Sequence, residues 1–126
     1  MDAFAHVNNT VYFRWFESAR IAYFDRVDFR GGGSHDGVGP ILASTQCRFR
    51  RPLVYPDAVR VGTRVTDIGV DRFTMEYRVV SEATGQLAAD GSGVVVAFDY
   101  RAGRKAGLPP AVRAAMRALD PAERAP

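Results

Sequence analysis

An early segment of this chain is predicted to form one long helix that is apolar on nearly every side. Asn8 or Asn9 can cap its start with a short side-chain acceptor, and the segment continues to about Phe29. Between Val11 and Val27, charged residues interrupt it at only a few positions, namely Arg14, Glu17, Arg20, Asp25 and Arg26. A helix with so little polar surface needs other structure around it. We therefore expect a central helix that is wrapped by the rest of the protein.

Alternating apolar and polar residues after this segment predict strands, since successive side chains of a strand point to opposite faces. The expected strands cover residues 41–49, 59–65, 73–79 and 87–100. Gly91 and Gly93 lie inside the last of them, where glycine often marks a bulge or a bend. Short connections favour an antiparallel meander. Residues 110–119 predict a final amphipathic helix with Pro110 in its first turn.

These segments predict an α+β fold in which an antiparallel sheet wraps around one long central helix. The length of 126 residues fits a single domain over residues 1–126. One sheet around one helix leaves a helix flank and a sheet edge uncovered. Self-association as a dimer or tetramer is therefore expected.

Charge and cysteine usage exclude several classes of protein. The formal net charge is +3, and the basic residues are dispersed, with a local concentration only at Arg48, Arg50 and Arg51. Dispersed arginine is weak evidence for a nucleic-acid partner, and none is expected. The lone Cys47 reads as a small packed side chain and suits a reducing compartment. With no membrane span or signal peptide visible, we expect a cytoplasmic protein.

Polar residues concentrate just before and inside the start of the helix, where residues 2–12 bring together an acid, an imidazole, two carboxamides and a phenol. A helix N-terminus offers unpaired N–H groups and positive potential, which can polarise a carbonyl or hold an oxyanion. A carboxylate on the preceding loop, Asp2, can act there as base or nucleophile. The same residues also permit a plainer interpretation, in which Asn8 or Asn9 only caps the helix and His6 is a loop histidine.

Several motifs then occur in a fixed order. The run DAFAHVNN at residues 2–9 is followed by Tyr12 and by FESAR at residues 16–20. This combination resembles the 4-hydroxybenzoyl-CoA thioesterase family of hotdog proteins, which carry Asp-x-x-Gly-His-x-Asn-Asn, then Tyr, then Phe-Glu-x-Ala-Arg. Residues 49–53 (FRRPL) and 55–57 (YPD) are similar to the family's strand and turn after the helix. The resemblance implies a hotdog fold and hydrolysis of an acyl- or aryl-CoA thioester, without a metal or a cofactor besides the CoA of the substrate.

The resemblance also implies roles for individual residues. Asp2 matches the family's catalytic aspartate, which activates water or attacks the thioester directly. The backbone N–H of Asn9 matches the group that polarises the thioester carbonyl. His6, Asn8 and Tyr12 would shape the substrate pocket around those groups.

Glu17 is a second candidate acid, because some hotdog thioesterases place their carboxylate on the central helix. An ion pair between Glu17 and Arg20, one turn apart, is the alternative. The sequence departs from the family at Ala5, where relatives have a glycine. Relatives also have a strand before the aspartate, so we expect that strand to be absent from a chain that begins at Met1.

For coenzyme A, the resemblance implies phosphate contacts near the dimer surface and a site at the subunit interface. Arg48, Arg50 and Arg51 are candidates, since guanidinium groups suit phosphate. Strand alternation sends Arg48 and Arg50 to one face and Arg51 toward the other, so all three cannot act together.

Other functions remain open beside the thioesterase. A non-catalytic acyl-CoA-binding or structural hotdog protein is the main alternative. A hotdog hydratase fits less well, because such enzymes pair an acid and a histidine in a different motif. A basic nucleic-acid module has no support beyond the net charge.

Overall fold

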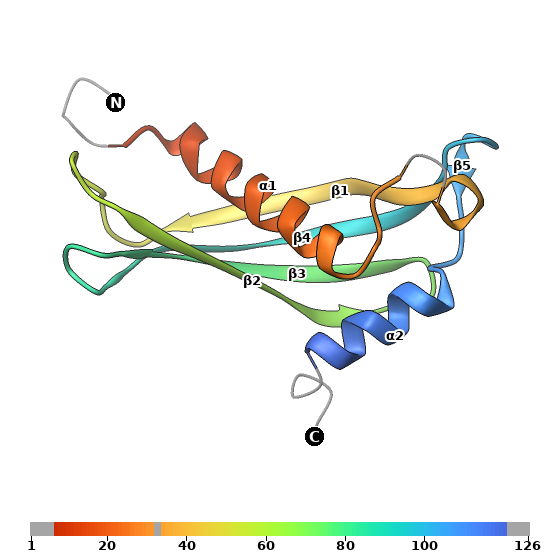
Figure 1. The fold of residues 1–126 in the computed structure, drawn as a ribbon. Coiled ribbons are helices and arrows are strands. Elements are labelled where there is room, and N and C mark those ends of the chain that lie inside the picture. Colours follow the sequence, from red (N-terminus) through yellow and green to blue (C-terminus); the bar gives the residue numbers. More distant parts are fainter. Residues whose placement is uncertain (1–6, 32–33, 121–126) are drawn as a thin grey trace.

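A computed structural model describes residues 7–31 and 34–120. It contains two α-helices, a short 3-10 turn and an antiparallel sheet (Figure 1). In chain order these elements are α1 (Asn9–Arg26), the turn Ser34–Gly37, β1 (Val38–Phe49), β2 (Val59–Ile68), β3 (Arg72–Ser81), β4 (Leu87–Asp99), β5 (Arg104–Lys105) and α2 (Pro110–Leu119). The helix α1 lies along one face of the sheet, as the apolar segment predicted (Figure 1).

Helix α1 begins where the capping pattern predicted. The Asn8 side chain accepts a hydrogen bond from the backbone N–H of Thr10 at 2.9 Å, so Asn8 is the N-cap. The helix ends earlier than the predicted Phe29, because Asp28 adopts a left-handed conformation with φ 54°. Phe29 N–H then bonds back to the carbonyl of Phe24 at 2.9 Å, which keeps the Phe29 ring buried although it lies outside the helix.

The order of strands in the sheet is β1-β4-β3-β2, with β5 beside one end of β4. The strands β2, β3 and β4 form the expected meander, but the expectation is wrong for β1, which pairs with β4. The connection from β1 to β2 spans residues 50–58 and is too long for a tight hairpin. It carries the chain from one edge of the sheet to the other.

The core lies between α1 and the face of the sheet that it covers, here called the inner face. Phe16 of α1 stacks on Tyr77 of β3 with ring centroids 4.5 Å apart. Gly91 of β4 permits this contact, because a Cβ there would lie 2.6 Å from Phe16 Cε2. The register of β4 is continuous at Gly91 and Gly93, so neither glycine marks a bulge, and the register of β4 with β3 shifts instead between Ala89 and Leu87.

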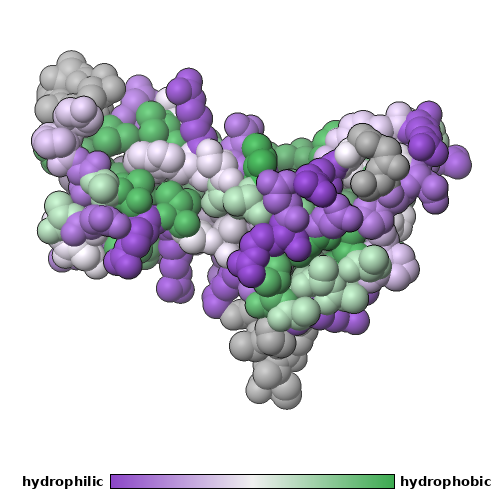
Figure 2. Space-filling view, viewed as in Figure 1, coloured by the Kyte–Doolittle hydropathy of each residue, from purple (hydrophilic) through white to green (hydrophobic). Residues whose placement is uncertain are grey.

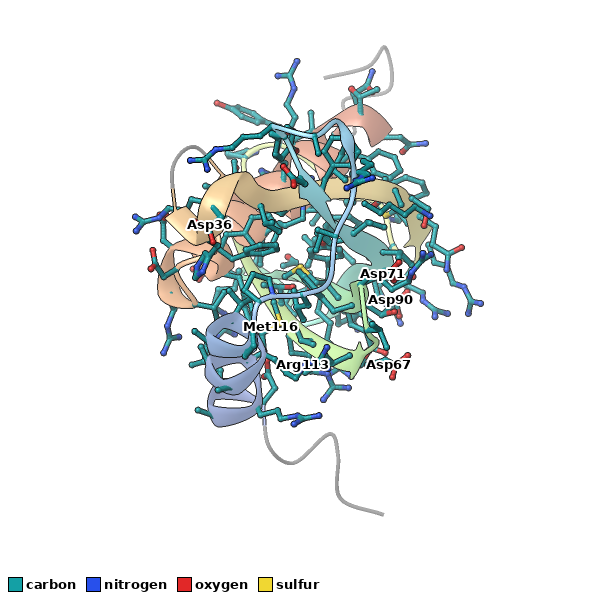
Figure 3. The ribbon with its side chains drawn as sticks, turned by 90° about the vertical axis from the view of Figure 1, so that its right-hand side faces the viewer. Asp36, Asp67, Asp71, Asp90, Arg113 and Met116 are labelled. Atoms are coloured by element: carbon teal, nitrogen blue, oxygen red, sulfur yellow. The ribbon has the colours of Figure 1, made fainter. Side chains whose placement is uncertain are left out.

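Helix α2 has the predicted bounds and covers part of the β2 edge. It buries Val112 and Met116 completely, and Figure 3 shows Met116 pointing toward the sheet. Asp120, which caps its C-terminus, accepts hydrogen bonds from the Val65 N–H at 3.1 Å and from the Tyr23 hydroxyl at 2.7 Å. One carboxylate therefore ties α2 to both β2 and α1.

Candidate active site

The start of α1 presents a backbone donor at the position that the sequence predicted. Asn9 is the first residue of α1, so its N–H has no acceptor inside the helix. The next two N–H groups are occupied: Thr10 N–H donates to Asn8 Oδ1, and Val11 N–H donates to the Asn8 carbonyl at 3.0 Å. Among residues 7–31 and 34–120, nothing accepts a hydrogen bond from Asn9 N–H. An oxygen of a ligand can therefore bind there at the positive end of the helix.

A largely apolar hollow of ≈ 250 Å³ lies beside this donor. Its lining residues are Val7, Val11, Trp15, Leu53, Tyr55, Asp57 and Val59. Figure 2 shows hydrophobic side chains gathered around the N-terminal turns of α1. The spacing of Val11 and Trp15, four residues apart, places them on one side of the helix. The hollow can take an apolar group whose polar end faces the helix start.

The segment that enters α1 is fastened to the wall of this hollow. Val7 N–H donates to the carbonyl of Leu53 at 2.9 Å. Asp2 and His6 lie outside the described residues, so their catalytic and pocket roles stay predictions. This hydrogen bond holds Val7 in the wall of the hollow.

Asp57 is a polar residue of the hollow that the sequence did not single out as functional. Its Oδ2 accepts a hydrogen bond from the Ser81 hydroxyl, and its Oδ1 accepts one from the Ala83 N–H at 3.2 Å. The Ser81 hydrogen bond, helped by the backbone N–H groups of Ala83 and Ala58, holds the pKa of Asp57 below its usual range. A carboxylate engaged in this way is better suited to fixing the loop than to accepting a proton. The motif at residues 55–57 was the only sequence signal for it.

Tyr12 lies beneath the hollow and does not line it. Its ring packs edge-on against Trp15 and Phe49, with centroid distances of 5.2 and 5.0 Å. Burial, with a smaller effect from Cys47, raises the pKa of the Tyr12 phenol. Tyr12 therefore supports Trp15 from below, and its contact with a substrate stays a prediction.

Glu17 and Arg20 do not form the alternative ion pair. Arg20 is only 8% exposed, and it donates from Nη1 to the Tyr77 hydroxyl at 3.1 Å. Burial raises the pKa of Tyr77, so its hydroxyl remains a neutral acceptor. Glu17 is exposed on the side of α1 that faces away from the sheet, with no ion-pair partner among the described residues. It remains a candidate acid.

The three predicted CoA-binding arginines fall in two different places. Arg48 and Arg50 line a hollow of ≈ 260 Å³ on the face of the sheet away from α1, called the outer face. Arg51 lines a separate hollow of ≈ 310 Å³ that shares Leu53 and Asp57 with the apolar one. Arg51 is thus separated from Arg48 and Arg50, and the binding of CoA by these arginines stays a prediction.

Three further findings concern the described part of the chain. The residues from 7 to 31 and from 34 to 120 contain no group of three or more His, Cys, Asp or Glu that could hold a metal ion. Within the same ranges, no helix has the length and apolar character that a membrane crossing requires. Cys47 is half-buried, and burial followed by the charge of Asp90 raises the pKa of its thiol.

The chain is similar in sequence and in structure to known thioesterases. The model of the Thioesterase-like superfamily matches residues 1–116. A thioesterase from Thermus thermophilus, solved with coenzyme A and zinc, is 36% identical, covers 96% of this chain and 86% of its own, and has a TM-score of 0.81. The uncharacterized protein YsmA of Bacillus subtilis is 25% identical over 82% of this chain and 68% of its own length. The long-chain acyl-CoA thioesterase FadM of Escherichia coli is 24% identical over 80% of this chain and 76% of its own.

The fold and these similarities define the class as that of a thioester hydrolase with the hotdog fold, in agreement with the resemblance. The chain belongs to the thioesterase-like superfamily. The predicted α+β fold, an antiparallel sheet around one long helix, is confirmed.

Proposed function

We propose that this protein hydrolyses an acyl-CoA or aryl-CoA thioester to a free acid and CoA. The observation that carries the proposal is the N–H of Asn9, which has no acceptor among the described residues, beside an apolar hollow at the start of α1. The hollow would take the acyl or aryl group, and the N–H would polarise the thioester carbonyl. The CoA bound to the similar Thermus thermophilus thioesterase supports CoA as the carrier.

Asp2 would supply the carboxylate by one of two routes. As a general base it takes a proton from water, whose oxygen attacks the carbonyl carbon; the carbon–sulfur bond then breaks and the proton goes to the CoA thiolate. As a nucleophile it displaces CoA to form a mixed anhydride, which water then hydrolyses to the acid and Asp2. In both routes the Asn9 N–H stabilises the oxyanion that develops on the carbonyl oxygen.

The other predicted pocket residues would act on these groups indirectly or at the rim. Asn8 holds the helix start through its cap, and Tyr12 supports the wall of the hollow through Trp15. His6 would orient the acid or the carbonyl from the loop before the helix. Glu17 would be the acid if a substrate lies against the exposed side of α1 instead.

The oligomer is also part of the proposal. Large apolar side chains are exposed along the edge strand β1, where Ile41, Leu42 and Phe49 are 40%, 39% and 44% exposed. Phe13 and Ile21 are exposed on α1. A second copy that joins β1 to β1 would cover these surfaces and would place the site at the subunit interface. We propose a cytoplasmic dimer or tetramer on this basis and on the lone cysteine.

Release of CoA from a panel of acyl- and aryl-CoA esters, followed with a thiol reagent, tests the function. We expect Asp2→Asn to lower the rate by about a hundredfold or more, as loss of a general base or nucleophile does. Glu17→Gln should retain most of the rate if Asp2 is the acid. Loss of activity in Glu17→Gln with Asp2→Asn unaffected would move the acid to α1.

The main alternative is a protein that binds acyl-CoA without hydrolysing it. Calorimetric binding of a non-hydrolysable acyl-CoA thioether by the wild-type protein, together with no release of CoA from any ester, would favour this alternative. Turnover that depends on Asp2 excludes it.

A further inference from the structure

The outer face of the sheet carries a polar trough at the end nearest the apolar hollow. The hollow lined by Arg48 and Arg50 adjoins a second one, of ≈ 190 Å³, and the two share Glu76 and Arg78. Together they cross the sheet from β1 to β2. We call the combined depression the outer trough. Figure 3 shows Asp90, which lines it, on the side of the sheet opposite α2.

Strand register brings two arginines to opposite sides of one aspartate. Arg48 of β1 lies opposite Asp90 of β4, and Asp90 lies opposite Arg78 of β3. Side chains that are paired across neighbouring strands point to the same face. The guanidinium groups of Arg48 and Arg78 therefore rise from the trough on either side of Asp90.

The negative charge of Asp90 is already paired with an arginine outside this pair. Arg50 donates to it twice, from Nε to Oδ1 at 3.3 Å and from Nη2 to Oδ2 at 3.0 Å. Across the described part of the chain, neither Arg48 nor Arg78 lies within ion-pair distance of a carboxylate. The two arginines thus remain available to an external anion.

The other carboxylate of the trough is also occupied. Glu76 Oε1 accepts hydrogen bonds from Arg64 Nε at 3.1 Å and from Nη2 at 2.9 Å. With both carboxylates paired, the trough has an excess of two positive charges, carried by Arg48 and Arg78. An excess of this size matches a phosphate monoester dianion, or two phosphate groups held at the ends of one ligand.

We propose that Arg48 and Arg78 bind the phosphate groups of an adenosine nucleotide, namely the 3′-phosphorylated ADP end of coenzyme A. The choice of this nucleotide rests on the proposed function. The position of Phe49 favours it, because its ring contacts Tyr12 beneath the apolar hollow while the preceding Arg48 points into the trough. Trough and hollow therefore lie at the same end of β1, on opposite faces. The flexible pantetheine arm would pass around this end of the sheet.

This assignment differs from the prediction made from the sequence. Arg78 was not a candidate there, because it lies about thirty residues along the chain from Arg48. Arg50 becomes a positioning residue, because its ion pair balances the charge of Asp90. Arg51 lies outside the trough. Since the groups are exposed, binding should be moderate and should weaken with added salt.

Binding of adenosine 3′,5′-bisphosphate to the intact chain, measured by calorimetry at low salt, tests the site without requiring hydrolysis. The double variant Arg48→Gln/Arg78→Gln should bind it about tenfold more weakly or worse, because two charge-assisted contacts are lost. Arg26→Gln is the matched control: it removes the same kind of charge from the exposed end of α1 and should bind within about twofold of wild type. Circular dichroism melting would show that all variants fold.

A second variant changes binding in the opposite direction. Asp90→Asn removes the carboxylate and releases Arg50, so binding should tighten several-fold. A purely structural role of the trough residues would not produce this gain. Unchanged binding in both the arginine pair and Asp90→Asn would overturn the site. Competition by inorganic phosphate as effective as that by the bisphosphate would show a general anion patch and would reject the nucleotide.

Steady-state kinetics connect the trough to the substrate. The double arginine variant should raise KM for an acyl-CoA and leave KM for the matching acyl-pantetheine unchanged, since the latter lacks the nucleotide. An equal rise for both substrates would contradict the proposal. If neither thioester is hydrolysed by wild type, the proposed function fails, and the bisphosphate titration still decides whether the trough binds the nucleotide.

Discussion

At the scale of single residues, Gly91 determines how closely α1 approaches the sheet. The ring of Phe16 lies flat on Tyr77, with an interplanar angle of 11°, and occupies the space above the Gly91 Cα. A Cβ on β4 at this position would meet both the backbone carbonyl oxygen of Gln46 in β1 and the ring of Phe16, so the β1 backbone or Phe16 would have to shift. The glycine is therefore required for close packing, and its freedom to adopt unusual backbone angles is not used.

Gly91→Ala should destabilise the protein by about 1–3 kcal/mol, because an overpacked core must shift a large side chain or the backbone. Urea unfolding followed by circular dichroism measures the change. Gly62→Ala is the matched control, since Gly62 lies within β2 and a Cβ there meets nothing within 4 Å. Equal stability of the two variants would show that neither Phe16 nor the Gln46 backbone is held against Gly91 as described.

The bond between Ser81 and Asp57 should give a pH-dependent contribution to stability. The folded-state pKa of Asp57 is lowered, so the contribution is fully present above the unfolded carboxyl pKa of about 4 and is lost as pH falls through the folded value. Ser81→Ala should therefore be less stable than wild type at neutral pH, and the difference in unfolding free energy should shrink below about pH 4. Ser92→Ala, whose hydroxyl bonds Gln46 and no carboxylate, should show a difference that does not vary in this way.

At the scale of elements, local patterns predicted most of the secondary structure. The alternation over residues 59–65 and 73–79 identified β2 and β3, and Pro110 marked the first turn of α2. The strand β1 was predicted, but its place beside β4 in the sheet was missed, because this pairing depends on contacts between residues about fifty positions apart. A long connection permits several strand orders, and nothing in its local sequence selects among them.

The candidate site divides in the same way between local and long-range features. Asn8 was predictable as a cap, and Asn9 as the first free donor, because both depend on a few consecutive residues. The wall formed by Leu53 and Asp57 was not predictable, because these residues lie near the helix start only as a result of the course of the β1–β2 connection, residues 50–58. Arg78 in the outer trough was missed for the same reason.

The cap of α1 supports a prediction about this element. Asn8→Ala should cost about 1 kcal/mol in unfolding free energy, because it leaves the Thr10 N–H unpaired at the helix start. Thermal and urea unfolding measure it. Asn9→Ala serves as the control, since it keeps the backbone N–H and removes a side chain that does not cap the helix. A loss in Asn9→Ala as large as in Asn8→Ala would mean that the cap is assigned to the wrong residue.

At the scale of the whole molecule, the two edges of the sheet differ in their cover. The edge at β2 is partly covered by α2, whose C-cap Asp120 accepts a hydrogen bond from the Val65 N–H. The edge at β1 has no such cover among the described residues, and it exposes the apolar side chains of Ile41, Leu42 and Phe49. A long, uncovered edge strand with exposed apolar side chains is a surface on which another strand can add. A second copy of the chain would cover this edge, because the β1 strands of two copies can pair about a twofold axis.

Ile41→Lys should therefore weaken the proposed dimer by about tenfold or more, because it places a charge in the apolar part of the edge. Light scattering with size-exclusion chromatography over a range of concentrations measures the mass, which should shift toward the monomer. Val70→Lys is the matched control: Val70 is also apolar and exposed but lies in the turn between β2 and β3, so the dimer should persist. A wild-type monomer, or a dimer unaffected by Ile41→Lys, would contradict assembly through β1. If the site lies at the interface, CoA release should fall with the fraction of dimer in Ile41→Lys and remain unchanged in Val70→Lys.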